Sequence, residues 1–198
     1  MALFVEANVR QRGLREVQRS GVFKKAERLV VEAMESYSSE KSYDIFLSHS
    51  FRDAELILGI KCILEDLGYS VYVDWIDDLQ LDRTKVTPAT ADKLRRRMGS
   101  SKSLFYVTTG NAVSSKWMPW ECGYFDGLNE KVAIVPVVES SQDNVFRGQE
   151  YLGLYPYVVK QQNKRKEERL WVRLNECKYL AYNAWVLGSS ASWVWKDG

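Results

Sequence analysis

The chain has 198 residues, of which 45% are hydrophobic, and this is enough for one domain with its own buried core. Its 28 basic and 26 acidic residues give a net charge of +2, whereas nucleic-acid-binding domains are usually strongly basic. The 3 cysteines lie far apart and form no CxxC pair, which indicates reduced thiols in a cytoplasmic protein rather than a disulfide framework or a zinc knuckle.

The first half of the chain predicts a helix, a strand and a second helix. Apolar side chains recur at spacings of three and four over 14–37, with charged ones on the other face, which predicts an amphipathic helix. A polar break at 38–42 separates this helix from a short apolar strand at 43–49. Apolar residues at helical spacing follow over 56–67, and Gly68 is well placed to end that second helix.

The middle of the chain continues the alternation. Residues 70–75 predict a second strand, and a long polar stretch, 76–86, follows it. Thr87 is a good N-cap for a helix over 88–98, which has proline at its first position. A third strand is expected over 103–109.

The last third predicts two more strands and two more helices. A helix is expected around 116–128, a fourth strand over 131–138 and a short fifth strand over 157–159. The charged stretch 160–169 then leads into a last helix through 170–181. Strands that alternate with helices are typical of a parallel sheet with helices on both faces.

Five strands in this order predict an α/β fold, a flavodoxin-like three-layer arrangement with a five-stranded parallel sheet. In such sheets, strands one and three flank the topological switch point, and ligands bind beyond the carboxyl ends of the strands there. The site should therefore be built from residues just after the first strand, His49 to Phe51, and just after the third, 111–121.

The sequence excludes several kinds of chemistry. His49 is the single histidine, so a two-histidine metal site is impossible, and a Ser-His-Asp or Cys-His arrangement would depend on this residue alone. Neither a GxGxxG nor a GxxxxGK[ST] phosphate loop is present. There is no secretory signal and no apolar run of about 18 residues. We therefore expect no metal, no nucleic-acid partner and no membrane-spanning segment.

Four motifs follow one another in the chain: YDIFLSH at 43–49 with an acid at Asp53, VYVDW at 71–75, SSKWMPWE at 114–121, and VAIVPV at 132–137. Together they resemble the Toll/interleukin-1 receptor (TIR) domain family over roughly 43–160. The resemblance implies a TIR domain at 41–160, between an N-terminal helical extension at 1–40 and a C-terminal helix with a Trp-rich tail at 161–198. We expect this tail to pack on the domain.

In TIR proteins that act as enzymes, the glutamate of the third motif is needed to cleave NAD, and Glu121 stands at that position. The resemblance thus implies an NAD+ nucleosidase, a hydrolase or cyclase, for which NAD is the substrate and no cofactor is needed. Cleavage of the nicotinamide–ribose bond builds positive charge on the ribose, and a fixed carboxylate can stabilise that charge. Nicotinamide is already a cationic leaving group, so no general acid is required.

Seven further residues are candidates for binding the substrate: His49, Ser50, Phe51, Asp74, Trp75, Arg83 and Trp117. Trp117 shares a helix face with Glu121 and could wall the pocket, or it could equally belong to the core. His49 could be a structural histidine, and Ser50 could cap the next helix. Glu121 itself could simply favour the helix dipole, and Cys122 is assigned to the core.

The loop at 74–83 corresponds to the BB loop of the family, which in enzymatic relatives closes over the substrate and contacts a neighbouring subunit. Its length predicts self-association through this loop, with Asp77 and Asp78 as exposed charges. The basic run 93–97 is expected to be a solvated helix face.

Stand-alone TIR proteins of this size resemble the signalling enzymes of anti-phage systems such as Thoeris. There an ADP-ribose-derived messenger activates a separate effector protein. The alternative is a non-catalytic TIR adaptor module that binds other TIR domains, and the glutamate motif favours the enzyme.

Overall fold

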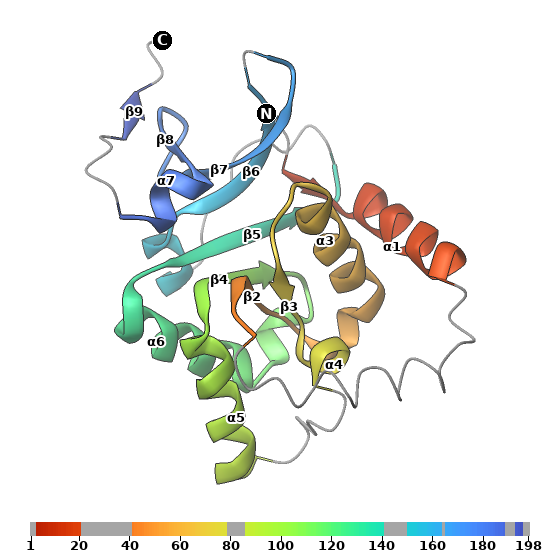
Figure 1. The fold of residues 1–198 in the computed structure, drawn as a ribbon, viewed down its shortest axis with the longest axis vertical. Coiled ribbons are helices and arrows are strands. Elements are labelled where there is room, and N and C mark those ends of the chain that lie inside the picture. Colours follow the sequence, from red (N-terminus) through yellow and green to blue (C-terminus); the bar gives the residue numbers. More distant parts are fainter. Residues whose placement is uncertain are drawn as a thin grey trace.

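The structure is a computed structural model, and it describes residues 3–20, 41–78, 86–140, 150–163, 165–188 and 193–195. A mostly parallel sheet lies between two layers of helices (Figure 1). The parallel strands of the domain are β2 (Tyr43–Ser48), β3 (Val71–Tyr72), β4 (Ser101–Thr108), β5 (Val132–Val138) and β6 (Tyr157–Gln162).

The order of these strands in the sheet is β3-β2-β4-β5-β6, so the second strand lies outside the first. This is the flavodoxin-like order, in which the chain winds outward in both directions from between the first and third strands. The predicted fold class is confirmed, and its switch point lies between the carboxyl ends of β2 and β4.

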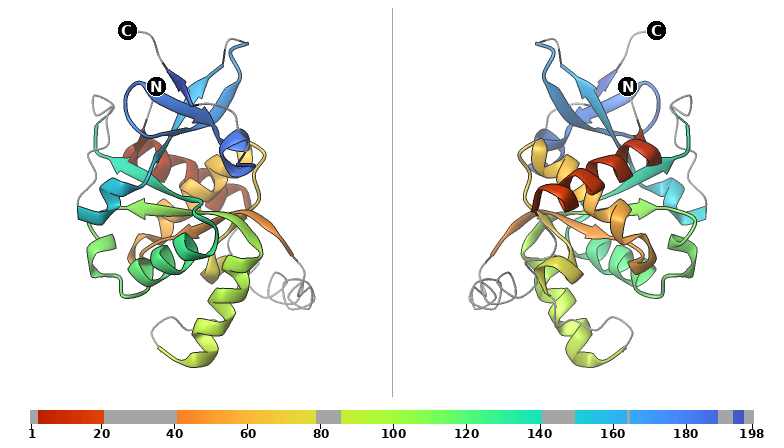
Figure 2. Two further views of the ribbon diagram at one scale, coloured as in Figure 1. Left: turned by 90° about the vertical axis from the view of Figure 1, so that its left-hand side faces the viewer. Right: turned by 90° about the vertical axis from the view of Figure 1, so that its right-hand side faces the viewer.

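Helices cover both faces of the sheet (Figure 2). On one face lie α1 (Glu6–Ser20) and α3 (Ala54–Asp66), and on the other lie α5 (Pro88–Gly99) and α6 (Trp117–Asn129). Side chains of a strand alternate between the two faces. In β2, Ile45 and Leu47 join the hydrophobic cluster under α3, whereas Phe46 joins the cluster under α6. The same alternation turns Ser48, the last residue of β2, toward α6.

Several local sequence signals are confirmed. Thr87 caps α5, because its hydroxyl accepts a hydrogen bond from the Thr90 N–H at 3.1 Å. Gly68 follows α3 with a φ of 91°, a conformation that glycine adopts at little cost. Pro119 lies in the first turn of α6, where a missing N–H costs nothing. The predicted strand at 70–75 is shorter than expected, because helix α4 (Asp74–Asp77) begins where β3 was expected to continue.

The N-terminal segment differs from the prediction. It starts with a short strand, β1 (Phe4–Val5), which pairs with the carboxyl end of β5, and α1 begins at Glu6 rather than at residue 14. The remainder of the predicted helix, from 21 onward, lies outside the described residues. Helices α1 and α3 approach closely: a Cβ on Gly59 would lie 2.0 Å from the carbonyl oxygen of Val9. A helix face that contacts its neighbour through glycine lacks the apolar side chain that would have revealed it.

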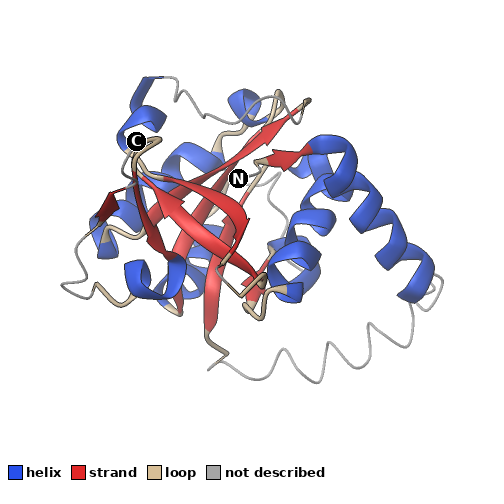
Figure 3. Cartoon of the chain, turned by 90° about the horizontal axis from the view of Figure 1, so that it is seen from above, coloured by secondary structure: helices blue, strands red, loops and turns tan. Residues whose placement is uncertain are grey.

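The predicted last helix at 170–181 is wrong. The chain instead forms β7 (Glu168–Arg173), β8 (Lys178–Ala181) and β9 (Val194–Trp195), with a short helix α7 (Tyr182–Val186) between the last two. These strands extend the sheet in antiparallel order beyond β6 (Figure 3). Leu170 and Val172 are buried and Trp171 between them is partly exposed, which is the two-residue alternation of a strand. Among the described residues, no helix is both long enough and apolar enough to cross a bilayer.

Candidate active site

Glu121 lies on the face of α6 that packs on the sheet. The buried residues of this helix recur at helical spacing: Trp117, Met118, Glu121, Cys122 and Phe125. The side chain of Glu121 is 0% exposed, and its Oε2 accepts a hydrogen bond from the hydroxyl of Ser48 at 2.6 Å. The carboxylate therefore lies at the end of β2, at the switch point.

Ser48 is a site residue that the sequence prediction missed. It is fully buried and directly precedes the predicted candidates His49 and Ser50. A signal for it was present, because strand alternation places Ser48 on the same face as Phe46, under the helix that carries Glu121. The sequence prediction identified the end of this strand as part of the site, but it did not include the face of the strand on which Ser48 lies.

Two predicted site residues, His49 and Asp74, meet beside this carboxyl edge. The His49 Nδ1 lies 2.7 Å from the carbonyl oxygen of Leu47, so this nitrogen carries the proton that is donated. Its Nε2 lies 3.3 Å from Oδ1 of Asp74, and both side chains are buried.

A second carboxylate joins the loops that follow β2 and β4. Oδ2 of Asp53 accepts from the Thr109 hydroxyl at 2.6 Å, and Oδ1 accepts from the amide of Asn111 at 2.7 Å. The expected side-chain cap from Ser50 is wrong: its carbonyl, and not its hydroxyl, accepts the Asp53 N–H at 3.1 Å. Phe51, between these residues, is 69% exposed at the rim of the site.

Trp117 begins α6 and is buried in the cluster under this helix. Its ring packs edge-on against Trp120 at a centroid distance of 5.4 Å, and Trp120 in turn stacks on Tyr124. The guanidinium of Arg95, on α5, lies 5.4 Å from the Trp120 ring, which joins the two helices of this face. The role of Trp117 as a pocket wall stays a prediction.

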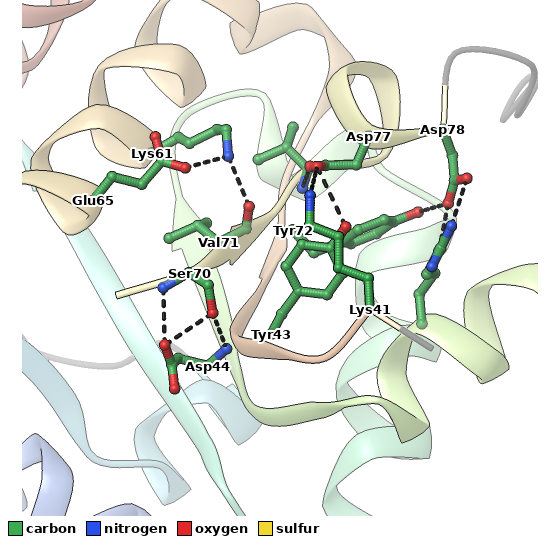
Figure 4. A network of polar contacts seen from close by, with 12 residues as sticks. Lys41, Tyr43, Asp44, Lys61, Glu65, Ser70, Val71, Tyr72, Asp77 and Asp78 are labelled. Atoms are coloured by element: carbon green, nitrogen blue, oxygen red, sulfur yellow. Dashed lines mark hydrogen bonds and ion pairs between the residues drawn. The ribbon is translucent and has the colours of Figure 1, made fainter. Parts of the chain in front are cut away.

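The residues after β3 are less exposed than expected (Figure 4). Asp78 is buried and accepts hydrogen bonds from Arg97 at 2.8 and 3.0 Å and from the Tyr72 hydroxyl at 2.8 Å, while Lys93 lies 2.9 Å away. Burial alone would raise the pKa of Asp78, but these partners outweigh it and hold the pKa below its usual value.

Asp77 has the opposite balance, because burial is the largest influence and raises its pKa, although the Val73 N–H donates to it at 2.8 Å. The expectation that Asp77 and Asp78 are exposed loop charges is therefore wrong. So is a fully solvated 93–97 face, because Lys93 and Arg97 both bind Asp78. Trp75 is partly buried against the core, and Arg83 lies outside the described residues.

Cys122, next to the proposed catalytic residue, belongs to the buried cluster as predicted. Burial raises the pKa of its thiol to about 11, so it stays protonated and does not offer a thiolate nucleophile. Within the part of the chain that the structure describes, no group of three or more His, Cys, Asp or Glu side chains could hold a metal ion.

No protein-family model matches the chain. Over 191 residues, the chain is 49% identical to a Bacillus cereus (strain MSX-D12) protein named "Probable 3' cyclic ADP-D-ribose synthase ThsB'". This match covers 94% of the chain and 98% of the relative. A Cytobacillus dafuensis protein named "Putative cyclic ADP-D-ribose synthase TIR2" is 30% identical over 105 residues, which are 52% of the chain and 28% of that protein.

Proposed function

This chain belongs to the bacterial TIR-domain family that includes ThsB', and from this membership we propose that it cleaves NAD and closes the product into a cyclic ADP-ribose. Glu121 is the catalytic carboxylate in this proposal. The observation that carries it is the position of Glu121, fully buried at the switch point and bound by Ser48. Ligands of flavodoxin-like sheets bind at that point.

The proposed reaction has two steps. The bond between the anomeric carbon and the nicotinamide nitrogen breaks, and nicotinamide leaves as a neutral molecule with the bonding electron pair. The ribose gains positive charge, which the carboxylate of Glu121 stabilises. A ribose hydroxyl from the adenosine half of the same molecule then attacks the anomeric carbon and releases its proton. If water attacks instead, the product is linear ADP-ribose.

The other predicted residues have supporting roles in this proposal. Ser48 holds the carboxylate of Glu121 in one orientation. Ser50 and the exposed ring of Phe51 follow the end of β2, and in this proposal they contact the substrate. His49 and Asp74 fix the start of α4 against the end of β2, and Trp117 walls the pocket. We keep Trp75 and Arg83 as substrate-binding candidates from the loop after β3.

The alternative function, a non-catalytic adaptor, explains the buried carboxylate of Glu121 less well. Burying a carboxylate costs free energy unless its hydrogen bonds are supplied by the protein, and even then a buried apolar side chain is often at least as stable. A module that only bound other TIR domains would gain nothing from Glu121 in this position. An enzyme gains a negative charge held away from water, where it acts most strongly on a positive transition state.

We further propose the wider setting that the resemblance implies. The product serves as a signal for a separate effector protein in anti-phage defence. All three cysteines, Cys62, Cys122 and Cys177, are free thiols, which supports a cytoplasmic location.

We also propose self-association through the loop after β3, so specific activity should rise more steeply than protein concentration. Initial rates at saturating NAD, measured beside light scattering, test this. A strictly proportional rate from a monomer at every concentration would rule it out.

The decisive experiment is incubation of the protein with NAD, followed by mass spectrometry of the products. Glu121→Gln should lower nicotinamide release by about 10²-fold or more, because a neutral amide does not stabilise positive charge as a carboxylate does. The fold should persist, since the glutamine oxygen can still accept from Ser48. Glu130→Gln, at the exposed end of the same helix, is the matched control and should be as active as wild type. Undiminished release by a folded Glu121→Gln would contradict the mechanism.

A further inference from the structure

Asp53 does not do what an acidic residue at the start of a helix usually does. It stands at the N-cap of α3, where a carboxylate commonly accepts hydrogen bonds from the first turn and stabilises the helix. Its side chain makes no such bond. Instead its two oxygens bind Thr109 and Asn111, which follow β4, at 2.6 and 2.7 Å. The carboxylate thus bridges the two sides of the switch point.

The segment that Asp53 holds leads directly to the catalytic helix. The carbonyl of Thr109 accepts the Ala112 N–H at 3.1 Å, and the carbonyl of Asn111 accepts from Ser114. The Ser115 hydroxyl then accepts the Met118 N–H, in the first turn of α6, at 3.3 Å. These bonds make a continuous path from Asp53 to the turn that precedes Glu121. The loop and the helix start are therefore placed by the Asp53 contacts.

We infer that Asp53 is a positioning residue, which fixes the start of α6 relative to β2 and thereby determines how much of the product is cyclic. This inference rests on the NAD cleavage proposed above. Two ties join β2 and its loop to α6 and its loop: the Ser48–Glu121 bond, and the clamp of Asp53 with Thr109 and Asn111. The packing of α6 on the sheet and the Ser48–Glu121 bond hold the body of the helix, and the contacts of Asp53 hold the loop that determines where the helix begins.

Cyclisation is more sensitive to this geometry than hydrolysis. It requires one hydroxyl at the far end of the same substrate to reach the anomeric carbon, which forms a C–O bond as the hydroxyl proton leaves. Hydrolysis requires only a water molecule, which can reach the anomeric carbon from many directions once the residues around it are less tightly held. A misplacement of about 1 Å can cost about 10²-fold in an oriented intramolecular step. The cyclic product should therefore be lost before nicotinamide release is lost.

The first test is Asp53→Ala. The rate of cyclic product formation should fall about 10²-fold and that of nicotinamide release only about tenfold, so that linear ADP-ribose becomes the main product. The KM for NAD should change less than kcat, because the residue does not touch the substrate. An unchanged ratio of cyclic to linear product, with wild-type nicotinamide release, would overturn the inference.

A reciprocal exchange separates the clamp from the carboxylate itself. Asn111→Asp places a second carboxylate where the amide nitrogen now lies, 2.7 Å from Asp53 Oδ1, and should be as defective as Asp53→Ala. The double variant Asp53→Asn, Asn111→Asp restores a donor facing an acceptor, and Thr109 can still donate to the new amide oxygen. The cyclic fraction should recover to within about threefold of wild type. If the double variant stays as defective as Asn111→Asp alone, the clamp is not the cause.

Asp44→Ala is the matched control. Asp44 lies at the opposite end of β2 and also joins two elements, because it accepts from Ser70 at 2.9 Å (Figure 4) and from Lys102 at 2.8 Å. Its loss should lower stability without changing the product ratio. If it changed the ratio as much as Asp53→Ala, the effect would be one of general stability.

Hydrogen exchange of the amides at 109–118 gives a readout that does not depend on NAD cleavage. Asp53→Ala should speed hydrogen exchange of these amides, and the double variant Asp53→Asn, Asn111→Asp should restore their protection. If these amides are as protected in Asp53→Ala as in the wild type, the proposed role of the Asp53 contacts is wrong. A wild-type protein that released no nicotinamide, yet showed this exchange pattern, would contradict the proposed function and not the clamp.

Discussion

Asp53 and Asp78 follow neighbouring strands of the sheet, β2 and β3, and both residues are 4% exposed. The donors that hold them differ. Asp53 binds a hydroxyl and a side-chain amide, both from the loop after β4. Asp78 binds the guanidinium of Arg97, the ammonium of Lys93 and the hydroxyl of Tyr72. Two equally buried carboxylates are thus stabilised in different ways.

This difference distinguishes Asp78, which anchors a loop, from Asp53, which belongs to the candidate active site. Two cations more than balance the single charge of Asp78, so this contact fixes the start of the loop after β3 to α5 without adding negative potential. The donors at Asp53 are neutral, so its charge remains beside the end of β2. A reaction that builds positive charge on a ribose benefits from negative potential at that edge. We therefore expect substitutions near Asp78 to change stability, and substitutions near the end of β2 to change the rate.

Asp78→Ala should have the larger effect. Its removal leaves Arg97 and Lys93 facing each other without their partner, and we expect the free energy of unfolding to fall by about 2–3 kcal/mol. This is below the figure for a fully buried pair because Lys93 is partly exposed. For a chain of this size, the melting temperature should fall by about 4–12 °C.

Thermal denaturation measures this effect, and Asp92→Ala is its control. Asp92 is exposed and pairs with Arg95 at 2.7 Å, and exposed pairs of this kind contribute little. Nicotinamide release by Asp78→Ala, measured well below its melting temperature, should stay within about twofold of wild type. A large loss of rate at unchanged stability would place Asp78 in the site and remove the distinction drawn above.

Ser48→Ala should affect the rate instead. The variant removes the hydroxyl that orients Glu121, and hydrogen bonds to charged groups contribute about 1.5–3 kcal/mol, so kcat should fall by about tenfold or more. A stopped assay of nicotinamide release at saturating NAD measures it. The melting temperature should also fall, because Ser48→Ala takes a hydrogen bond from a buried carboxylate, so kcat is compared well below the melting temperature of both proteins.

The matched control is Ser103→Ala. Ser103 is also a fully buried serine, on the neighbouring strand β4, and its hydroxyl binds the carbonyl of Asp44 at 3.0 Å and the hydroxyl of Tyr182 at 2.9 Å. These contacts attach α7 to the sheet, away from Glu121, so kcat should not change while stability decreases. Equal losses of kcat in both variants would show that Ser48 acts only through packing.

Much of the fold was predictable because its strands and helices have distinct periodicities. Apolar runs such as 132–138 are typical of strands buried on both faces, and Thr87 and Gly68 marked helix ends correctly. The C-terminal strands were mistaken for a helix because Leu170 and Leu174 are spaced as they would be on a helix face. Antiparallel pairing with β6 decides their structure, and this is a long-range property of the sheet.

The site was predictable in position but not in its contacts. Glu121, His49 and Asp74 were placed by motif and topology, and the structure brings them to one edge. Ser48 and the clamp of Asp53 were not predicted. Each depends on which way a side chain turns from a known backbone position. The exposure of Asp77 and Asp78 was misjudged because a polar stretch does not reveal its partners, which are the Val73 N–H for Asp77 and cations of α5 for Asp78.

The smallest effect concerns pH, and Asp77 and Asp78 should act with opposite signs. The pKa of Asp78 is lowered in the folded state, so its contribution is fully present above the unfolded value of about 3.9. It is lost as pH falls through the folded pKa. Burial raises the pKa of Asp77, so the folded protein binds that proton more tightly. Stability from Asp77 is therefore lost as pH rises through its folded pKa.

Chemical denaturation between pH 3 and 7 tests this difference between adjacent residues. Asp78→Asn should flatten the acid loss of stability, because the group whose protonation breaks the contact with Arg97 is gone. Asp77→Asn should steepen it, because an opposing contribution is removed while the amide oxygen still accepts the Val73 N–H. If both variants shift the profile in the same direction, then the two carboxylates share one environment, and the anchor does not depend on the cations that face Asp78.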